Sequence, residues 1–175
     1  MTESELIQDF DGESILLALS KGATLTADEI ESIKFYLEYS KKQPKNKRSL
    51  EEIYLILTVL NKANNPELHY IVEQFLDFQD PIVAAFALEI LVKKWGVYQD
   101  LHERLVKFAL GMPWDREQDL RETTLECIKT IIQEETENFN EEILLRYKSL
   151  CEEILKDKTC TEDIRELALE MKSLF

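Results

Sequence analysis

The sequence contains few of the residues that interrupt helices and few signs of β structure. Only four glycines and four prolines stand among 175 residues, and none of them interrupts an apolar period. No sustained alternation of apolar and polar residues separates the turn signals. These absences exclude a sheet-based architecture and predict an all-α fold. With 45% hydrophobic residues, the chain can build the core of one domain over residues 1–175.

Disulfide and targeting signals are also missing. The three cysteines, Cys127, Cys151 and Cys160, form an odd set without a CxxC pair, which favours free thiols in a reducing compartment. The first residues, MTESELIQDF, are acidic and show no signal-peptide pattern, and no apolar run has membrane-spanning length. We therefore expect a cytoplasmic protein.

No catalytic motif stands out in the sequence. The HExxH motif, a Cys/His cluster and a Gly-rich phosphate loop are all absent. His69 and His102 share a Leu-His context, which indicates packing more than zinc ligation, and no base is marked beside a cysteine. We expect neither an enzyme nor a bound metal or cofactor.

Positive charge is scarce and unevenly placed. The net charge is −14, which disfavours a nucleic-acid backbone or an anionic membrane as the main partner because both attract Lys and Arg. Five of the 21 basic residues lie in the run KKQPKNKR (41–48), which we interpret as a solvated interhelical loop. The rest of the chain holds 16 basic and 35 acidic residues, a balance of −19, which favours a basic protein partner.

Capping residues and glycines predict where helices begin and end. Thr26 with Glu29 and Ser49 with Glu52 fit the capping box. The pairs at 65–66 and 80–81 place an N-cap residue before proline, and three glycines each follow an apolar-periodic segment. These signals predict helices near 3–10, 13–21, 27–42, 50–63, 66–78, 81–95, 98–110, 117–134, 140–156 and 162–174.

Two helical patterns recur along the chain. The segments IVAAFALEI (82–90), DLRETTLEC (119–127) and DIRELALEM (163–171) align without gaps, at spacings of 37 and 44 residues. A second pattern joins PELHYIVEQFL (66–76) to QDLHERLVKFA (99–109), at a spacing of 33 residues. Recurrence at such periods is typical of stacked helical hairpins.

These hairpins resemble HEAT-like repeats, because DPIVAAFALEIL (80–91) is similar to the D-P-x-V-R-x-x-A-L stretch of that family. The resemblance is clearer over 66–175 than over 13–63, which would form divergent N-terminal hairpins. It departs from the family at Ala84, where Arg is usual, and at Thr123 and Thr124, where small apolar residues are usual. The resemblance implies a short α-α superhelix, or solenoid, with one extended surface for a protein partner.

The acidic segment DREQDLRETTLEC (115–127) has two interpretations. Asp119 aligns with Asp163 just ahead of a repeat helix, so we interpret it as a cap or as a charge favoured at the helix N-terminus. Asp115 and Glu117 could form a carboxylate site with Asp119, but no His, Cys or Gly-rich loop lies nearby. A solvated acidic loop is the favoured interpretation.

A small, strongly acidic, stand-alone repeat protein resembles the immunity proteins that bacteria keep against basic toxins, including nucleases and toxins of contact-dependent growth inhibition. An acidic surface would mimic a nucleic-acid backbone and steer association. The alternative is a scaffold or adaptor in a protein complex. A HEAT-like DNA glycosylase is disfavoured because its groove should be basic. The expected contact residues combine carboxylates with one tryptophan from an interhelical loop: Glu73, Asp77, Asp100, Glu103, Trp114, Asp115 and Glu117.

Overall fold

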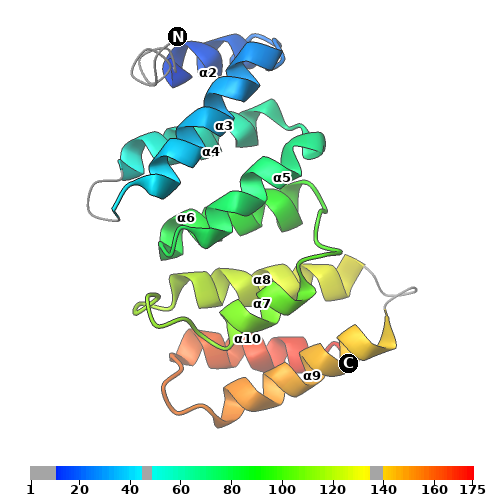
Figure 1. Cartoon of the computed structure of the whole chain (residues 1–175). Coiled ribbons are helices and arrows are strands. Elements are labelled where there is room, and N and C mark those ends of the chain that lie inside the picture. Colours follow the sequence, from blue (N-terminus) through cyan, green and yellow to red (C-terminus); the bar gives the residue numbers. More distant parts are fainter. Residues whose placement is uncertain (1–10, 45–48, 135–139) are drawn as a thin grey trace. The chain divides into compact units, whose positions relative to one another are not determined.

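The computed structural model describes residues 11–44, 49–134 and 140–175, and over these residues it contains helices and no strand (Figure 1). The all-α prediction is therefore confirmed for this part of the chain. The helix expected at 3–10, residues 45–48 of the basic run and residues 135–139 lie outside the described residues. The chain forms two compact units, Met1–Phe78 and Gln79–Phe175. A single domain over 1–175 stays a prediction, and we describe each unit by itself.

The first unit begins with three capped helices, α2 (Gly12–Ser20), α3 (Ala27–Lys42) and α4 (Leu50–Ala63). The capping box predicted for Thr26 and Glu29 is present in both directions. Ser49 also accepts a bond from the Glu52 amide, while the Glu52 carboxylate accepts one from the Tyr36 hydroxyl. Helix α2 packs against α4. Local capping thus places these helices close to where the sequence predicts them.

The segment from Pro66 to Phe78 differs from the single helix that the sequence predicts. It consists of a 3₁₀ turn, η2 (Pro66–Leu68), a short α-helix, α5 (His69–Val72), and a second 3₁₀ stretch, η3 (Glu73–Asp77). Val72, Phe75 and Phe78 are all buried. Their spacing of three residues matches the 3.0 residues per turn of a 3₁₀-helix, so the tighter winding keeps all three on the core side.

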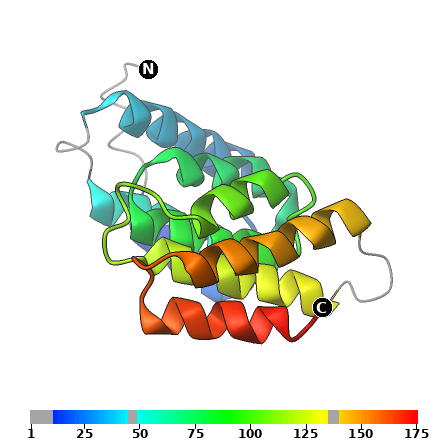
Figure 2. The same cartoon turned by 90° about the horizontal axis from the view of Figure 1, so that it is seen from below.

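The second unit is built from α6 (Pro81–Leu88), which continues as the π-helical turn η4 (Glu89–Lys94), and from α7 (His102–Ala109), α8 (Asp119–Glu134), α9 (Glu141–Lys156) and α10 (Glu162–Lys172). Helix α8 packs against both α6 and α10, and α7 packs against α8 and α9. Figures 1 and 2 show α9 and α10 side by side and antiparallel. The unit therefore has α6, α8 and α10 in one layer and α7 and α9 in another.

Two helix starts in the second unit were predicted too early. Helix α7 begins at His102, because the Leu101 amide bonds the Tyr98 carbonyl and closes a separate turn. Helix α8 begins at Asp119, because Gln118 has a φ of 66° and cannot continue the helix toward residue 117. Gly96 and Gly111 have φ values of 64° and 98°, as expected for residues that end helices in the left-handed conformation.

The residues matched by the first sequence pattern occupy similar environments in α6, α8 and α10. Three of these positions form buried sets: Val83, Leu120 and Ile164, then Ala87, Thr124 and Ala168, and the pair Leu88 and Leu125. The exception is Leu169, which corresponds to Leu88 and Leu125 but is 56% exposed on α10. Side chains at the matched positions are therefore buried in all three helices, except that Leu169 on α10 is exposed.

The three cysteines are buried free thiols, and all belong to the second unit. Burial raises the pKa of Cys127 to about 12 and that of Cys151 to about 11, and it also raises the pKa of Cys160. These thiols therefore stay protonated near neutral pH. Among the described residues, no helix combines the length and the apolar character needed to cross a bilayer.

Candidate functional site

The start of α8 is capped by Asp115, a residue that the sequence placed in a solvated loop. Its carboxylate accepts hydrogen bonds from the Leu120 amide at 3.4 Å and from the Arg121 amide at 3.0 Å. Asp115 is only 5% exposed, so the expectation that it belongs to a solvated loop is wrong, and its role as a partner-contact residue stays a prediction. Asp119 is the first residue of α8 and stays exposed in the first turn, where the helix dipole favours its charge.

Arg121, in the first turn of α8, is a buried cation that accepts no bond and donates to three segments of the unit. Its Nε donates to the Ala109 carbonyl at 2.8 Å, its Nη1 to Gln118 at 3.3 Å, and its Nη2 to Asp157 at 3.1 Å. The side chain is 4% exposed. These bonds join the end of α7, the start of α8 and the residue after α9. Arg121 and Asp115 therefore fix the geometry from which the neighbouring carboxylates project.

Carboxylates from α8 and α10 crowd together on the layer that these helices share. Burial, and then repulsion from Asp163, Glu126 and Asp119 in that order, raises the pKa of Glu122. Asp119, Glu122 and Asp163 are exposed and Glu126 is half-buried. We call these four residues the acidic face. Over the described ranges, no three Asp, Glu, His or Cys side chains gather closely enough to hold a metal ion.

Two lysines connect the helices of this layer beside the acidic face. The Lys93 ammonium lies 2.6 Å from the Glu126 carboxylate and 3.3 Å from that of Glu89, and so bridges η4 to α8. Lys129 lies 2.6 Å from Glu170 and bridges α8 to α10. Each lysine side chain is about 30% exposed, so each pair contributes modestly to stability. Glu126 is paired with Lys93 in this way but still adds to the repulsion at Glu122, so the face as a whole stays acidic.

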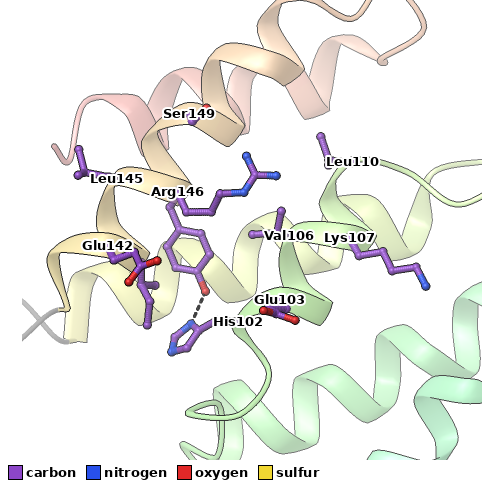
Figure 3. Close-up of a pocket in the computed structure, with 11 residues that line it drawn as sticks. His102, Glu103, Val106, Lys107, Leu110, Glu142, Leu145, Arg146 and Ser149 are labelled. Carbon is purple, nitrogen blue, oxygen red and sulfur yellow. Dashed lines mark hydrogen bonds between the residues drawn. The ribbon is translucent and has the colours of Figure 1, made fainter.

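An open groove of about 760 Å³ lies between α7 and α9, in the other layer of the unit (Figure 3). Val106 of α7 and Leu110, the residue after α7, line one part of it, and Ile143 and Leu145 line it from α9. Leu145 is 66% exposed and Leu110 is 39% exposed. Apolar side chains of this size are expensive to leave in water, so this wall is a candidate contact surface.

The rim of the groove carries charges in a regular order. Glu103 and Lys107 are four residues apart on α7, and Glu142 and Arg146 are four residues apart on α9. Figure 1 shows α7 and α9 running in the same direction, so both carboxylates come one turn before both cations. Arg146 also pairs with Glu153 at 2.7 Å on its own helix. The groove therefore has an acidic end and a basic end.

A hydrogen bond at the acidic end holds the two groove helices together. The His102 Nδ1 lies 2.7 Å from the Tyr147 hydroxyl, a contact that Figure 3 marks. The Tyr147 side chain is fully buried, and burial raises its pKa well above the ordinary value of a tyrosine. The second sequence pattern pairs His102 with His69, whose Nδ1 lies 3.0 Å from the Pro66 carbonyl. Each of the two imidazole rings therefore makes a hydrogen bond close to the start of its helix.

The expected contact residues are spread over several elements. Glu103 lines the groove, Asp100 is exposed just before α7, and Glu117 is exposed in the loop before α8. Trp114 packs edge-on against Phe108 at a ring-centroid distance of 6.3 Å, which anchors the ring while leaving part of it accessible. Glu73 and Asp77 both belong to η3 of the first unit, where Glu73 lies 3.9 Å from His69.

The acidic face was missed by the sequence interpretation, although the sequence contained a signal for it. Asp119 aligns with Asp163, and matched positions on neighbouring helices of one layer lie near each other. The alignment alone indicates a helix cap, and the crowding around Glu122 follows only once α8 and α10 pack against each other. The function has to be argued from these surfaces, since no protein family, curated protein or solved structure matches the chain.

Proposed function

We propose that this chain is a protein-binding module of HEAT-like hairpins that captures and neutralises a basic partner, as an immunity protein does with its toxin. The observation that carries the proposal is the packing of α8 beside α10, which places the exposed carboxylates of Asp119 and Glu122 near that of Asp163. Like charges held close together oppose folding. Their retention is explained if a cationic partner relieves the repulsion on binding.

Packing supports the HEAT-like part of the proposal. Successive helices of the second unit alternate between the α7–α9 layer and the α6–α8–α10 layer. The matched small residues Ala87, Thr124 and Ala168 are all fully buried, as close packing between stacked hairpins requires. A short solenoid of this kind would present the acidic face on one layer and the groove on the other.

Charge supports the choice of a basic partner. The whole chain carries −14, and the acidic face concentrates part of that charge on two adjacent helices. A negative surface raises the association rate with a basic protein and repels nucleic acid. A nuclease toxin fits because its own substrate is a polyanion. In this proposal the protein acts in the cytoplasm without catalysis or cofactor.

A growth-rescue assay tests the proposed role. The open reading frame immediately beside this one is expressed in a test bacterium, with and without this protein. Growth arrest that only coexpression relieves is the expected result. A neighbour that is harmless on its own would overturn the paired-toxin form of the proposal.

Surface variants then test the acidic face in the same assay. Glu122→Gln with Asp163→Asn should weaken both rescue and binding, whereas Glu152→Gln, which removes an exposed carboxylate from α9, should leave both unchanged. Binding through the face should weaken steeply with added salt, because exposed charges are screened. Binding that is insensitive to salt and to both sets of variants would instead favour an adaptor. A shift of labelled DNA by the protein alone would contradict the proposal.

A further inference from the structure

We propose that the groove between α7 and α9 binds an amphipathic helix of a partner protein. That helix carries an acidic residue toward Lys107 and Arg146, a basic residue four positions later toward Glu103 and Glu142, and apolar residues between them. The groove is in the opposite layer from the acidic face, and the argument for it is independent of toxin neutralisation.

The apolar wall supplies the affinity in this proposal. Leu145 is the most exposed large hydrophobic residue of the described chain, and it faces the same groove as Leu110. Leu145 lies on α9 and Leu110 directly follows α7, so the apolar lining comes from both sides of the unit's α7–α9 layer. A helix laid along such a lining buries its apolar stripe at positions three and four residues apart. Covering the exposed Leu110 and Leu145 together with the half-buried Ile143 would remove apolar surface of the groove from water.

The rim charges select the partner's sequence and direction. The carboxylates of Glu103 and Glu142 occupy one end, and the cations of Lys107 and Arg146 come one turn later on both helices. A Glu placed four residues before a Lys stabilises the helix that carries it, and this order is more favourable than its reverse. A partner with that order satisfies both ends of the groove only if it runs antiparallel to α7 and α9. In this antiparallel alignment the dipole of the partner helix also runs opposite to those of α7 and α9, which is the favourable arrangement.

The test uses a displayed library of helix-forming peptides about 16 residues long, roughly four turns at 3.6 residues per turn. Residues on one face are randomised, and the library is selected against the whole protein. Enriched peptides should carry apolar residues at helical spacing with the acidic residue four positions before the basic one. Leu145→Asp should weaken their binding by about tenfold or more. Leu169→Asp, at a comparably exposed leucine of α10, should leave it unchanged.

A charge-reversed variant tests the direction of binding. Peptides selected against Lys107→Glu should replace the acidic residue with a basic one, whereas peptides selected against the control Lys148→Glu should keep it. All substituted residues are exposed, and the melting temperature checks that each variant folds.

Three outcomes would overturn the inference. One is a selection in which no enriched peptide depends on Leu145. Another is binding of an apolar fluorescent dye that Leu145→Asp abolishes although no peptide is enriched, which would identify a small ligand as the occupant. The third is a dimer that Leu145→Asp dissociates without any peptide being enriched, which would identify a second copy of the chain.

Discussion

The guanidinium of Arg121 and the carboxylate of Asp157 form an ion pair at 3.1 Å that connects the start of α8 to the end of α9. The arginine is 4% exposed and the aspartate 31% exposed, so one member of the pair is buried and the other is at the surface. Because Arg121 also donates to the Ala109 carbonyl, three segments of the second unit depend on one side chain.

Replacing Arg121 with Met should lower the free energy of unfolding of the second unit by about 2–4 kcal/mol, because it leaves the buried Ala109 carbonyl and the Asp157 carboxylate without this donor. Both tryptophans, Trp95 and Trp114, lie in this unit, so urea unfolding followed by tryptophan fluorescence reports on it. The control Arg146→Met removes an exposed pair and should change stability by less than about 1 kcal/mol. Equal effects of the two variants would contradict the role given to Arg121.

The stability of the second unit should fall in acid partly through Asp157. Bonds from the Thr159 amide and hydroxyl, and then from Arg121 and Cys160, hold the pKa of this carboxylate well below its usual value of 3.8. A depressed folded-state pKa gives stability that is present above the unfolded-state pKa and is lost as the pH falls through the folded-state value. Asp157→Asn should therefore destabilise the unit at pH 7, and the difference from wild type should shrink steadily below about pH 4. A difference that is constant from pH 7 to pH 2 would refute this assignment.

Glu122→Gln should raise the unfolding free energy at pH 7 by a few tenths of a kcal/mol, roughly the scale of exposed charge pairs. The pKa of the wild-type Glu122 carboxyl is raised in the folded state, so the folded protein holds this proton more tightly than the unfolded chain does. The wild-type protein therefore loses stability as the pH rises from the unfolded-state pKa through the folded-state pKa of this group. The variant cannot ionise, so its advantage should disappear at pH 3. Thermal melting at both pH values measures this, with Glu152→Gln as the matched control. A loss of stability at pH 7 would show that the Glu122 charge is compensated.

Ala168→Leu should lower the free energy of unfolding much more than Thr124→Ala does. Ala168→Leu forces extra methylenes into a fully buried position and should cost about 1–3 kcal/mol or more. Thr124→Ala removes a hydroxyl that bonds the Leu120 carbonyl of its own helix at 2.6 Å, and should cost about 1 kcal/mol or less. Chemical unfolding of the two variants compares them directly. A costlier Thr124→Ala would argue against equivalent packing at the two positions.

Local signals allowed most helices to be predicted from the sequence. The capping box at Thr26 and Glu29 and the Asp80 cap before Pro81 each form as expected, because they involve residues within one turn. The interruption after Leu68 and the π-helical turn at Glu89–Lys94 were not predictable in this way. Apolar residues three and four apart fit an α-helix as well as these tighter and wider windings.

The surfaces were harder to predict than the helices. Asp115 was expected to be exposed, yet its carboxylate bonds amides five and six residues later, a reach that local cap patterns do not describe. The groove depends on α7 and α9, which are separated by the whole of α8, so its lining could not be assembled from periodicity within one helix. Glu103 was correctly placed on α7, but its neighbours across the groove, Glu142 and Arg146, come from packing alone.

Because Cys127, Cys151 and Cys160 are buried, the rate at which their thiols react measures how often the second unit unfolds. Each thiol is shielded from a labelling reagent in the folded unit, and at neutral pH each also stays in the unreactive protonated form. Alkylation can proceed only as fast as the helices separate, and mass spectrometry of intact protein would count the modified chains. The first unit has no cysteine to contribute. A partner that clamps α8, α9 and α10 would then reveal itself by slowing this reaction, without any label being engineered into the chain.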